Sequence, residues 1–153
     1  LMILGAATEP RASMNRIFFY GLFMDRALLT EQGLRPEVLG PARLPDYRIH
    51  IGQRATLVQR PGSRAFGVVM ELTEEEARVL YSAPSVREYI PESVQAELLE
   101  SGHWIEADCY NRPPEIGLAG TNPTYASQLA RLTRNLGLDP AYVEEIAAFA
   151  AGS

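Results

Sequence analysis

The hydrophobic pattern near the start of the chain predicts a buried strand followed by a sharp turn. Residues 15–20 form an apolar, aromatic run that ends at Gly21. A short apolar run bounded by glycine is typical of a buried strand. In residues 24–32 apolar positions lie among polar ones, and Gly33 provides a stop for a helix. We therefore expect a strand, a glycine turn and a short helix in this order.

The pattern that follows predicts a series of short strands separated by turns. Pro-Asp, Gly-Gln and Pro-Gly-Ser sequences interrupt the apolar positions, and such residues are typical of turns. The expected strands are 38–44, 47–51, 55–60, 64–72, 89–98 and 104–111. Short strands between closely spaced turns indicate an antiparallel meander that curls toward a barrel.

Helical patterns lie in one internal segment and in the C-terminal part of the chain. Thr73 and Glu76 have the spacing of a capping box, and the helix they open should run until Pro84. Apolar residues recur at helical spacing over 123–137, and a last helix follows Asp139-Pro140 and reaches residue 149. Because strands come first and helices last, the pattern indicates the α+β class.

Composition narrows the number of domains. The chain has 153 residues, of which 46% are hydrophobic and 22% charged, so one domain can bury a core without disulfides or metal. We expect a single domain over residues 14–153, with Met14 as the natural start and residues 1–13 as a flexible extension. Those first residues lack the basic region of a signal peptide, and no apolar run is long enough to span a bilayer.

Charge and the rarer residue types exclude several function classes. The net charge of −5 argues against a nucleic-acid partner. All 14 basic residues are arginine, which excludes Schiff-base chemistry and a P-loop lysine. Cys109 is the single cysteine, so we expect a buried structural thiol and a cytoplasmic, reducing location. His50 and His103 have no ligands at metal-binding spacing, and we expect neither a metal nor a cofactor.

The Tyr20-Gly21 turn is the first candidate for a binding site. A strand that ends in glycine and opens a helix leaves backbone N–H groups directed outward, where they can bind a carboxylate or an oxyanion. The alternative is that the glycine only connects a strand to a helix, as it does in many proteins.

The Tyr20-Gly21 turn belongs to a wider set of short motifs along the chain. They are Phe18-Phe19-Tyr20-Gly21-Leu22-Phe23, Phe66-Gly67-Val68-Val69-Met70-Glu71-Leu72, Glu88-Tyr89, Ser93-Val94-Gln95-Ala96, Ala107-Asp108-Cys109-Tyr110, Asn122-Pro123-Thr124-Tyr125, Gly137-Leu138 and Tyr142-Val143-Glu144-Glu145-Ile146. In order and spacing these motifs resemble the gamma-glutamylcyclotransferase-like family over residues 15–148. The resemblance implies a small closed or nearly closed β-barrel, of mixed or antiparallel strands, with flanking helices and two C-terminal helices.

The resemblance also implies a reaction and a ligand. In the family the α-amine of a gamma-glutamyl compound attacks its own γ-carbonyl, which gives 5-oxoproline and releases an amine. Backbone amides of a Tyr-Gly loop bind the substrate carboxylate and the oxyanion, and this loop corresponds to Tyr20, Gly21, Leu22 and Phe23. The expected partner is thus a small gamma-glutamyl or carboxylate ligand, with no membrane and no nucleic acid.

Two tyrosines are further candidates for the same pocket. Tyr89 and Tyr110 follow from their places in the motifs as substrate-binding residues. The alternative for both is a buried tyrosine whose hydroxyl is bonded within the protein.

The base of the family reaction is a glutamate in a Leu-Asp-x-x-Glu pattern after the second helix. In this sequence Tyr81 takes the aspartate position, and the glutamate position falls on Pro84 or Ser85. Glu88 is the nearest carboxylate and is our candidate catalytic base, expected within reach of the pocket; alternatively it pairs with an arginine at the surface.

The sequence accordingly leaves three hypotheses for the function. The first is a cyclotransferase that forms 5-oxoproline. The second is a protein that binds a small acidic metabolite without turnover, and the third is an interaction protein with a filled cavity.

Overall fold

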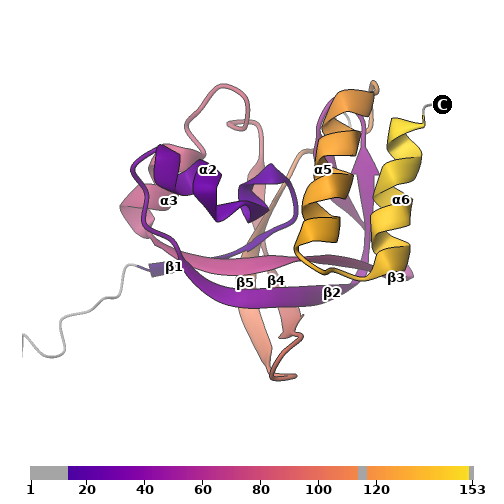
Figure 1. Cartoon of the computed structure of the whole chain (residues 1–153). Coiled ribbons are helices and arrows are strands. Elements are labelled where there is room, and N and C mark those ends of the chain that lie inside the picture. The colour runs from indigo at the N-terminus through magenta and orange to yellow at the C-terminus, as the bar shows by residue number, and fades with distance from the viewer. Residues whose placement is uncertain (1–13, 114–116, 152–153) are drawn as a thin grey trace, which may run out of the picture.

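The computed structural model of the chain describes residues 14–113 and 117–151, so the extension expected over residues 1–13 lies outside the described part. Figure 1 shows a curved sheet with two groups of helices above it. The elements, in order, are β1 (Met14–Phe19), η1 (Leu22–Met24), α2 (Arg26–Glu31), β2 (Glu37–Ile51), β3 (Ala55–Thr73), α3 (Glu74–Leu80), β4 (Ile90–Leu98), β5 (Trp104–Asn111), α5 (Pro123–Asn135) and α6 (Pro140–Ala150).

The five strands close into a barrel, as the pattern of short strands and the family resemblance predicted. The strand order is β1-β3-β2-β4-β5. Neighbouring strands are antiparallel, except that β1 meets β5 in parallel at Ile17 and Asp108. Closure places β1 beside β5, although the two strands lie far apart in the sequence. The α+β class is therefore confirmed.

The predicted meander of short strands is wrong in one respect, because four of the strands form two long ones. β2 continues through the Pro-Asp sequence and β3 through Pro-Gly-Ser, and their pairing shifts between Pro45 and Tyr47. Asp46 adopts a positive φ of 67° there, and its Oδ1 accepts a hydrogen bond of 3.0 Å from the Gly62 N–H. The turn-like residues thus form an irregularity inside one hairpin, which bends the strands without ending them.

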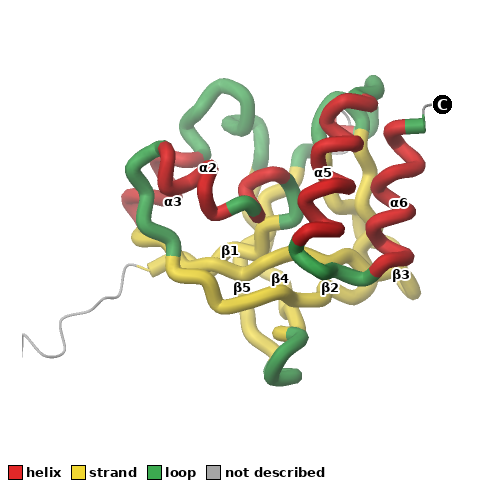
Figure 2. Tube along the Cα trace, viewed as in Figure 1, coloured by secondary structure: helices red, strands yellow, loops and turns green. Residues whose placement is uncertain are grey.

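The core has two parts that share β3. Residues of β2 alternate between buried and exposed, but residues 65–70 of β3 are all buried. One face of β3 points into the barrel, and the other lies under α6, where the rings of Phe66 and Tyr142 pack edge to face at 5.3 Å. Figure 1 and Figure 2 show α5 and α6 side by side on this part of the sheet. The C-terminal helices are therefore fixed to the barrel by burial of apolar surface.

The short helices differ in their ends from the prediction. The expected helix over 24–32 divides into η1 and α2, because Asp25 accepts a hydrogen bond from the Ala27 N–H and so caps a new helix. Thr73 and Glu76 form the predicted capping box, but α3 ends at Leu80 before Pro84. There the Ser82 hydroxyl donates to the Val79 carbonyl oxygen at 2.7 Å, which satisfies a carbonyl at the helix end.

The later elements agree with the prediction. The strands β4 and β5 begin and end within one residue of their expected positions, and Asn122 and Asp139 cap α5 and α6 through side-chain oxygens. Among the described residues, no helix is both long and apolar enough to cross a membrane.

Candidate functional site

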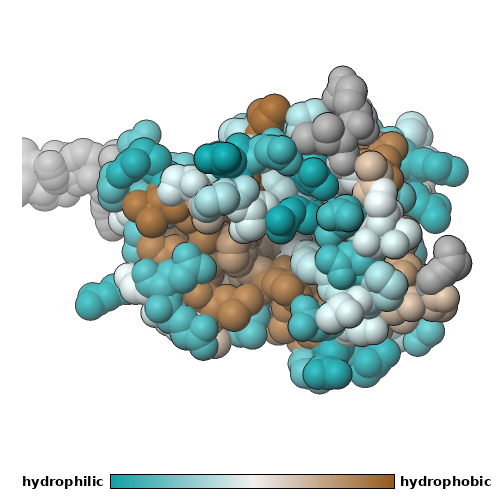
Figure 3. All heavy atoms as spheres, turned by 90° about the horizontal axis from the view of Figure 1, so that it is seen from above, coloured by the Kyte–Doolittle hydropathy of each residue, from teal (hydrophilic) through white to brown (hydrophobic). Residues whose placement is uncertain are grey.

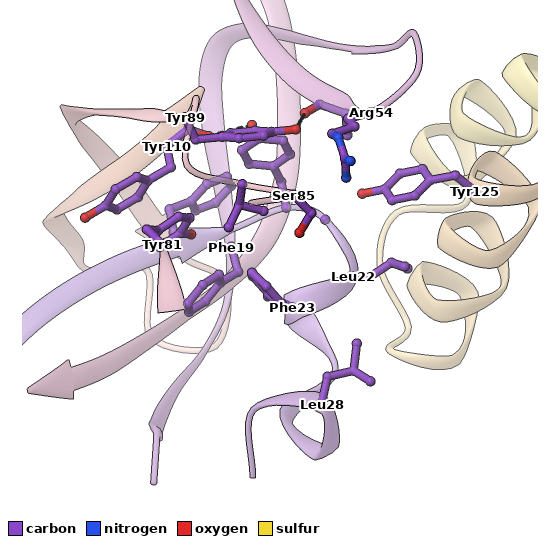
Figure 4. A pocket seen from close by; sticks show the side chains of 15 residues that line it. Phe19, Leu22, Phe23, Leu28, Arg54, Tyr81, Ser85, Tyr89, Tyr110 and Tyr125 are labelled. Atoms are coloured by element: carbon purple, nitrogen blue, oxygen red, sulfur yellow. Dashed lines mark hydrogen bonds between the residues drawn. The ribbon is translucent and has the colours of Figure 1, made fainter. Parts of the chain in front are cut away.

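A cavity of about 230 Å³ opens beside the end of β1. We call it the aromatic pocket, because most of its side chains are aromatic or aliphatic. Its lining is Phe18, Phe19, Tyr20, Gly21, Leu22, Phe23, Leu28, Arg54, Ala55, Tyr81, Ser85, Val86, Tyr89, Tyr110 and Tyr125. Seen from above, the molecule presents hydrophobic residues in the middle of this face, with hydrophilic residues around them (Figure 3). The lining comes from the β1 turn, the loop after α3, the β2–β3 turn and the start of α5 (Figure 4).

The predicted turn at residues 20–23 forms one wall of this pocket. Because η1 is a single 3₁₀ turn that closes with the Met24 N–H on the Gly21 carbonyl oxygen, the N–H groups of Gly21, Leu22 and Phe23 have no partner within it. Gly21 has a φ of −106° and a ψ of −157°, so the backbone does not require glycine. Space restricts it instead, since a Cβ at this position would lie 2.8 Å from the Tyr125 hydroxyl, which would have to move.

Tyr125 of α5 lies directly over that turn. The Leu22 backbone N–H lies near its hydroxyl oxygen, and the phenolic proton can be donated to a ligand. Burial nevertheless raises the pKa of Tyr125 far above its ordinary value, so the hydroxyl stays protonated. Helix α5 thus adds a neutral donor to the backbone donors of the turn.

The other tyrosines also stay protonated. The rings of Tyr81 and Tyr110 stack at 3.7 Å between centroids, and Phe23 meets Tyr81 edge to face at 6.3 Å. Burial raises the pKa of Tyr81 well above its ordinary value and that of Tyr89 to about 12. None of these groups is a base near neutral pH, so the aromatic wall supplies contact surface and proton donors.

Two predicted pocket tyrosines direct their hydroxyl groups into the protein. The Tyr20 hydroxyl donates to the Tyr110 carbonyl oxygen at 2.6 Å and to Asn111 Oδ1 at 2.8 Å. The Tyr89 hydroxyl donates to the Ala55 carbonyl oxygen at 2.6 Å. Both residues line the pocket, as does Tyr110, but Tyr20 and Tyr89 present rings and not free hydroxyls.

The structure does not place Glu88 in this pocket, contrary to the expectation from sequence. Among the described residues that line the cavity, none carries a carboxylate. The Glu88 side chain is 58% exposed, and its Oε1 accepts a hydrogen bond of 3.1 Å from Arg112 Nη2. The surface pairing left open as an alternative is the arrangement found, because Arg112 comes from the end of β5 and attracts the carboxylate away from the cavity.

Ser85 is, with Pro84, one of the two positions on which the glutamate of the family motif falls. Its side chain points into the pocket across from Leu22 (Figure 4). A hydroxyl there donates and accepts hydrogen bonds but does not take up a proton near neutral pH. The pocket therefore holds donors for an oxyanion and lacks the proton acceptor of the family reaction.

Tyr125 and Arg54 are among the pocket residues that sequence reasoning missed. Tyr125 was noted only as a motif residue and a helix position, and Arg54 was not considered. Arg54 follows the tight β2–β3 turn, where the Gly52 N–H donates to its carbonyl oxygen, and its side chain points toward Tyr125 (Figure 4). No local pattern marks either residue, because each reaches the pocket through the tertiary fold.

The described residues contain no group of three or more His, Cys, Asp or Glu side chains that could hold a metal ion. Cys109 is a free, fully buried thiol in the barrel core, and burial raises its pKa far above the ordinary value. It is therefore not a nucleophile near neutral pH.

Comparison with known proteins gives a family and several similar folds. The family described as "Gamma-glutamyl cyclotransferase, AIG2-like" matches residues 17–130. No curated protein matches. A solved structure called "Gamma-glutamyl cyclotransferase" is 20% identical, with a TM-score of 0.71 over 88% of this chain and 87% of its own.

Two further structures have similar folds. YkqA from Bacillus subtilis has a TM-score of 0.75 at 19% identity, and the match covers 97% of this chain but 58% of that protein. An AIG2-like protein from Mus musculus has a TM-score of 0.54 at 20% identity, over 67% of this chain and 81% of its own. At such identities the likeness concerns the fold.

Proposed function

Since this chain belongs to the gamma-glutamyl cyclotransferase, AIG2-like family, we propose that its aromatic pocket binds a small gamma-glutamyl or related carboxylate metabolite without cyclising it. The observation that carries this proposal is the lining of the pocket, which keeps oxyanion donors at residues 21–23 and, within the described part of the chain, has no carboxylate. Cyclisation needs a group that removes a proton from the attacking ammonium. Donors alone support recognition of the ligand.

The lining also favours one kind of ligand. The carboxylate or carbonyl oxygen of the ligand meets the Gly21 and Phe23 N–H groups and the Tyr125 hydroxyl. The remainder contacts the stacked pair Tyr81 and Tyr110 and the ring of Phe23. We therefore propose an apolar or aromatic amine half. A location in a reducing compartment such as the cytoplasm agrees with the free thiol of Cys109.

Titration of the chain with gamma-glutamylphenylalanine and gamma-glutamylalanine tests the binding. We expect saturable shifts of the Gly21 and Phe23 amide resonances in NMR spectra. Because it buries a phenyl group, gamma-glutamylphenylalanine should bind at least about tenfold more tightly than gamma-glutamylalanine. Tyr125→Phe removes one donor and should weaken binding of both compounds by about tenfold. Tyr142→Phe should change neither affinity, because the Tyr142 ring packs on Phe66 under α6 and does not line the pocket. Absence of saturable shifts would remove the proposal.

The same samples decide between binding and turnover. We expect no 5-oxoproline above the level of a blank after prolonged incubation. Formation of 5-oxoproline by the chain, with loss of that activity in Glu88→Gln, would instead support a cyclotransferase in which Glu88 leaves Arg112 and reaches the ligand. This second function is favoured by one observation, namely that Glu88 lies in the adjoining pocket next to Ser85.

A further inference from the structure

A second, polar pocket adjoins the aromatic pocket. Its lining is Gln53, Arg54, Pro84, Ser85, Glu88, Arg112, Ala119 and Gly120. Arg54 and Ser85 also line the aromatic pocket, so these two side chains form a wall between the cavities. A ligand that passes Ser85 would extend from the aromatic rings into a region of two arginines.

Arg112 is the central residue of the polar pocket. Its side chain is only 11% exposed, and its backbone N–H donates to Thr56 Oγ1 at 3.1 Å, which fixes the residue after the end of β5. Of its three guanidinium nitrogens, only Nη2 is bonded, to Glu88 Oε1. Nε and Nη1 are buried and have no hydrogen-bond partner among the described residues. Buried donors without a partner are rare in folded proteins.

The geometry of a guanidinium shows what could satisfy these atoms. Nε with Nη2, and Nη1 with Nη2, are the two edges on which an oxyanion binds with two parallel hydrogen bonds. Glu88 contacts the shared atom Nη2 through one oxygen and uses neither edge fully. An oxyanion that replaced Glu88 would gain the second donor. Because the Glu88 side chain is largely exposed, it can turn toward solvent without losing buried contacts.

The charges of the pocket favour an anion. Arg54 and Arg112 carry two positive charges and Glu88 one negative charge, so the lining has a net positive charge in a chain whose total is −5. Arg54 makes no salt bridge with the part of the chain that the structure describes. A positive pocket on an acidic protein attracts anions locally.

We infer that the polar pocket is a second oxyanion subsite, in which Arg112 and Arg54 bind a carboxylate or phosphate group on the amine half of the ligand. The link to one ligand rests on the function proposed for the aromatic pocket. The subsite itself rests on Arg112 and can be tested separately. A ligand of this class carries two anionic groups, one at the turn of residues 21–23 and one beside Arg112.

Titration of the full chain with inorganic phosphate, and separately with acetate, tests the subsite by NMR at constant ionic strength. We expect saturable shifts of the Arg54 and Arg112 Nε–H resonances and of the Gln53 and Gly120 amides. Saturation by phosphate alone supports a phosphate group, and saturation by acetate supports a carboxylate. Saturation by neither would overturn the inference, as would equal shifts at exposed arginines elsewhere.

Two variants with opposite expected effects on anion affinity make this test more specific. Arg112→Gln should weaken binding of the anion by about tenfold or more, since charge-assisted bidentate hydrogen bonds are lost. Glu88→Gln should strengthen binding by about threefold or more, because a competing carboxylate is removed. Arg134→Gln, at an exposed site on α5, is the matched control and should leave the affinity unchanged. If Arg112→Gln does not fold, the Glu88→Gln result decides alone, and unchanged or weaker binding there contradicts the subsite.

The outcome separates this inference from the proposed function. Binding of these anions together with no binding of gamma-glutamyl compounds would remove the proposed function and retain the subsite. The reverse result would remove the subsite alone.

Discussion

The aromatic pocket and the polar cluster around Asn111 adjoin at Tyr20 but satisfy their polar groups in different ways. In the cluster, Asn111 Oδ1 accepts from the Tyr20 hydroxyl at 2.8 Å and from the Leu57 N–H at 2.9 Å, while Nδ2 donates to Glu92 Oε1 at 3.2 Å. Glu92 Oε2 in turn accepts from the Tyr47 hydroxyl at 2.6 Å. Every member has a partner within the protein.

The pocket on the other side of Tyr20 is arranged differently. The N–H groups of Gly21 and Phe23 have no partner within η1, and the Ser85 side chain points into the cavity. Buried polar groups that are fully bonded stabilise one conformation, whereas unbonded groups facing a cavity are available to a ligand. The Asn111 cluster therefore stabilises the barrel, and the unbonded groups of the pocket are the reason that we propose it for binding.

The comparison of the cluster with the aromatic pocket also shows how Glu92 and Glu88, two carboxylates near the pocket, are bonded. Glu92 belongs to the closed cluster and Glu88 pairs with Arg112, so each nearby carboxylate is engaged outside the aromatic pocket. Among the described lining residues the pocket has no carboxylate, and the two positions on which the glutamate of the family motif falls, Pro84 and Ser85, carry none.

The largest expected effect comes from giving the pocket a carboxylate. Ser85→Glu places an acidic side chain at the lining position that faces Leu22. A positioned base contributes roughly 10²- to 10⁴-fold to a proton transfer, so this variant should form 5-oxoproline from gamma-glutamylphenylalanine when the parent chain does not. Ser85→Gln has the same shape without the base and is the control. Equal, blank-level product from both variants would show that the pocket lacks more than a base.

The second effect concerns the closed cluster. Asn111→Leu removes the acceptor of the Leu57 N–H, while the Tyr20 hydroxyl keeps the Tyr110 carbonyl oxygen as its acceptor. An unsatisfied buried group costs about 1–3 kcal/mol, so the free energy of unfolding should fall by about 1–3 kcal/mol. Urea denaturation measures this change. Asn135→Ala, at the exposed end of α5, should change stability by less than about 0.5 kcal/mol. A similarly small effect at Asn111 would mean that the cluster does not stabilise the barrel.

The sequence predicted those features of the molecule that depend on neighbouring residues. Short apolar runs between turn residues predicted the strands, and capping residues such as Thr73 and Asp139 predicted helix starts, because these signals act within a few residues. The Pro-Asp and Pro-Gly-Ser sequences wrongly predicted turns that end strands. Their actual role depends on a contact between Asp46 and Gly62, which forms only when the two long strands pair. A local turn signal does not distinguish a turn from an irregularity in a hairpin.

In the candidate site, too, the sequence predicted local features but not contacts made through the tertiary fold. Gly21 was predictable because a glycine at the end of an apolar run, within a family motif, indicates a turn. The direction of Glu88 was not predictable, because its partner Arg112 lies 24 residues away in the sequence. Tyr125 and Arg54 reach the pocket only when α5 and the β2–β3 turn pack against the end of β1. Sequence thus predicts the donor turn, while the surroundings of that turn depend on the tertiary structure.

The smallest expected effect isolates the turn itself. Gly21→Ala is compatible with the backbone angles at this position, but the new methyl group would lie 2.8 Å from the Tyr125 hydroxyl. Tyr125 must move aside, and the loss of its hydrogen bond should weaken binding of gamma-glutamylphenylalanine by about tenfold, or about 1.4 kcal/mol. Calorimetric titration measures this difference, and unchanged affinity would mean that the ligand binds away from the turn.

A double-mutant cycle locates the cause. In a Tyr125→Phe background the methyl group no longer meets a hydroxyl, so Gly21→Ala should cost less than it does in the parent chain. An equal cost in both backgrounds would show that the methyl group obstructs the ligand directly and not through Tyr125. Gly21 directly follows Tyr20, which belongs to the polar cluster around Asn111, and it is part of the turn that lines the aromatic pocket. Either result therefore shows how a change at the border between the cluster and the pocket affects the ligand.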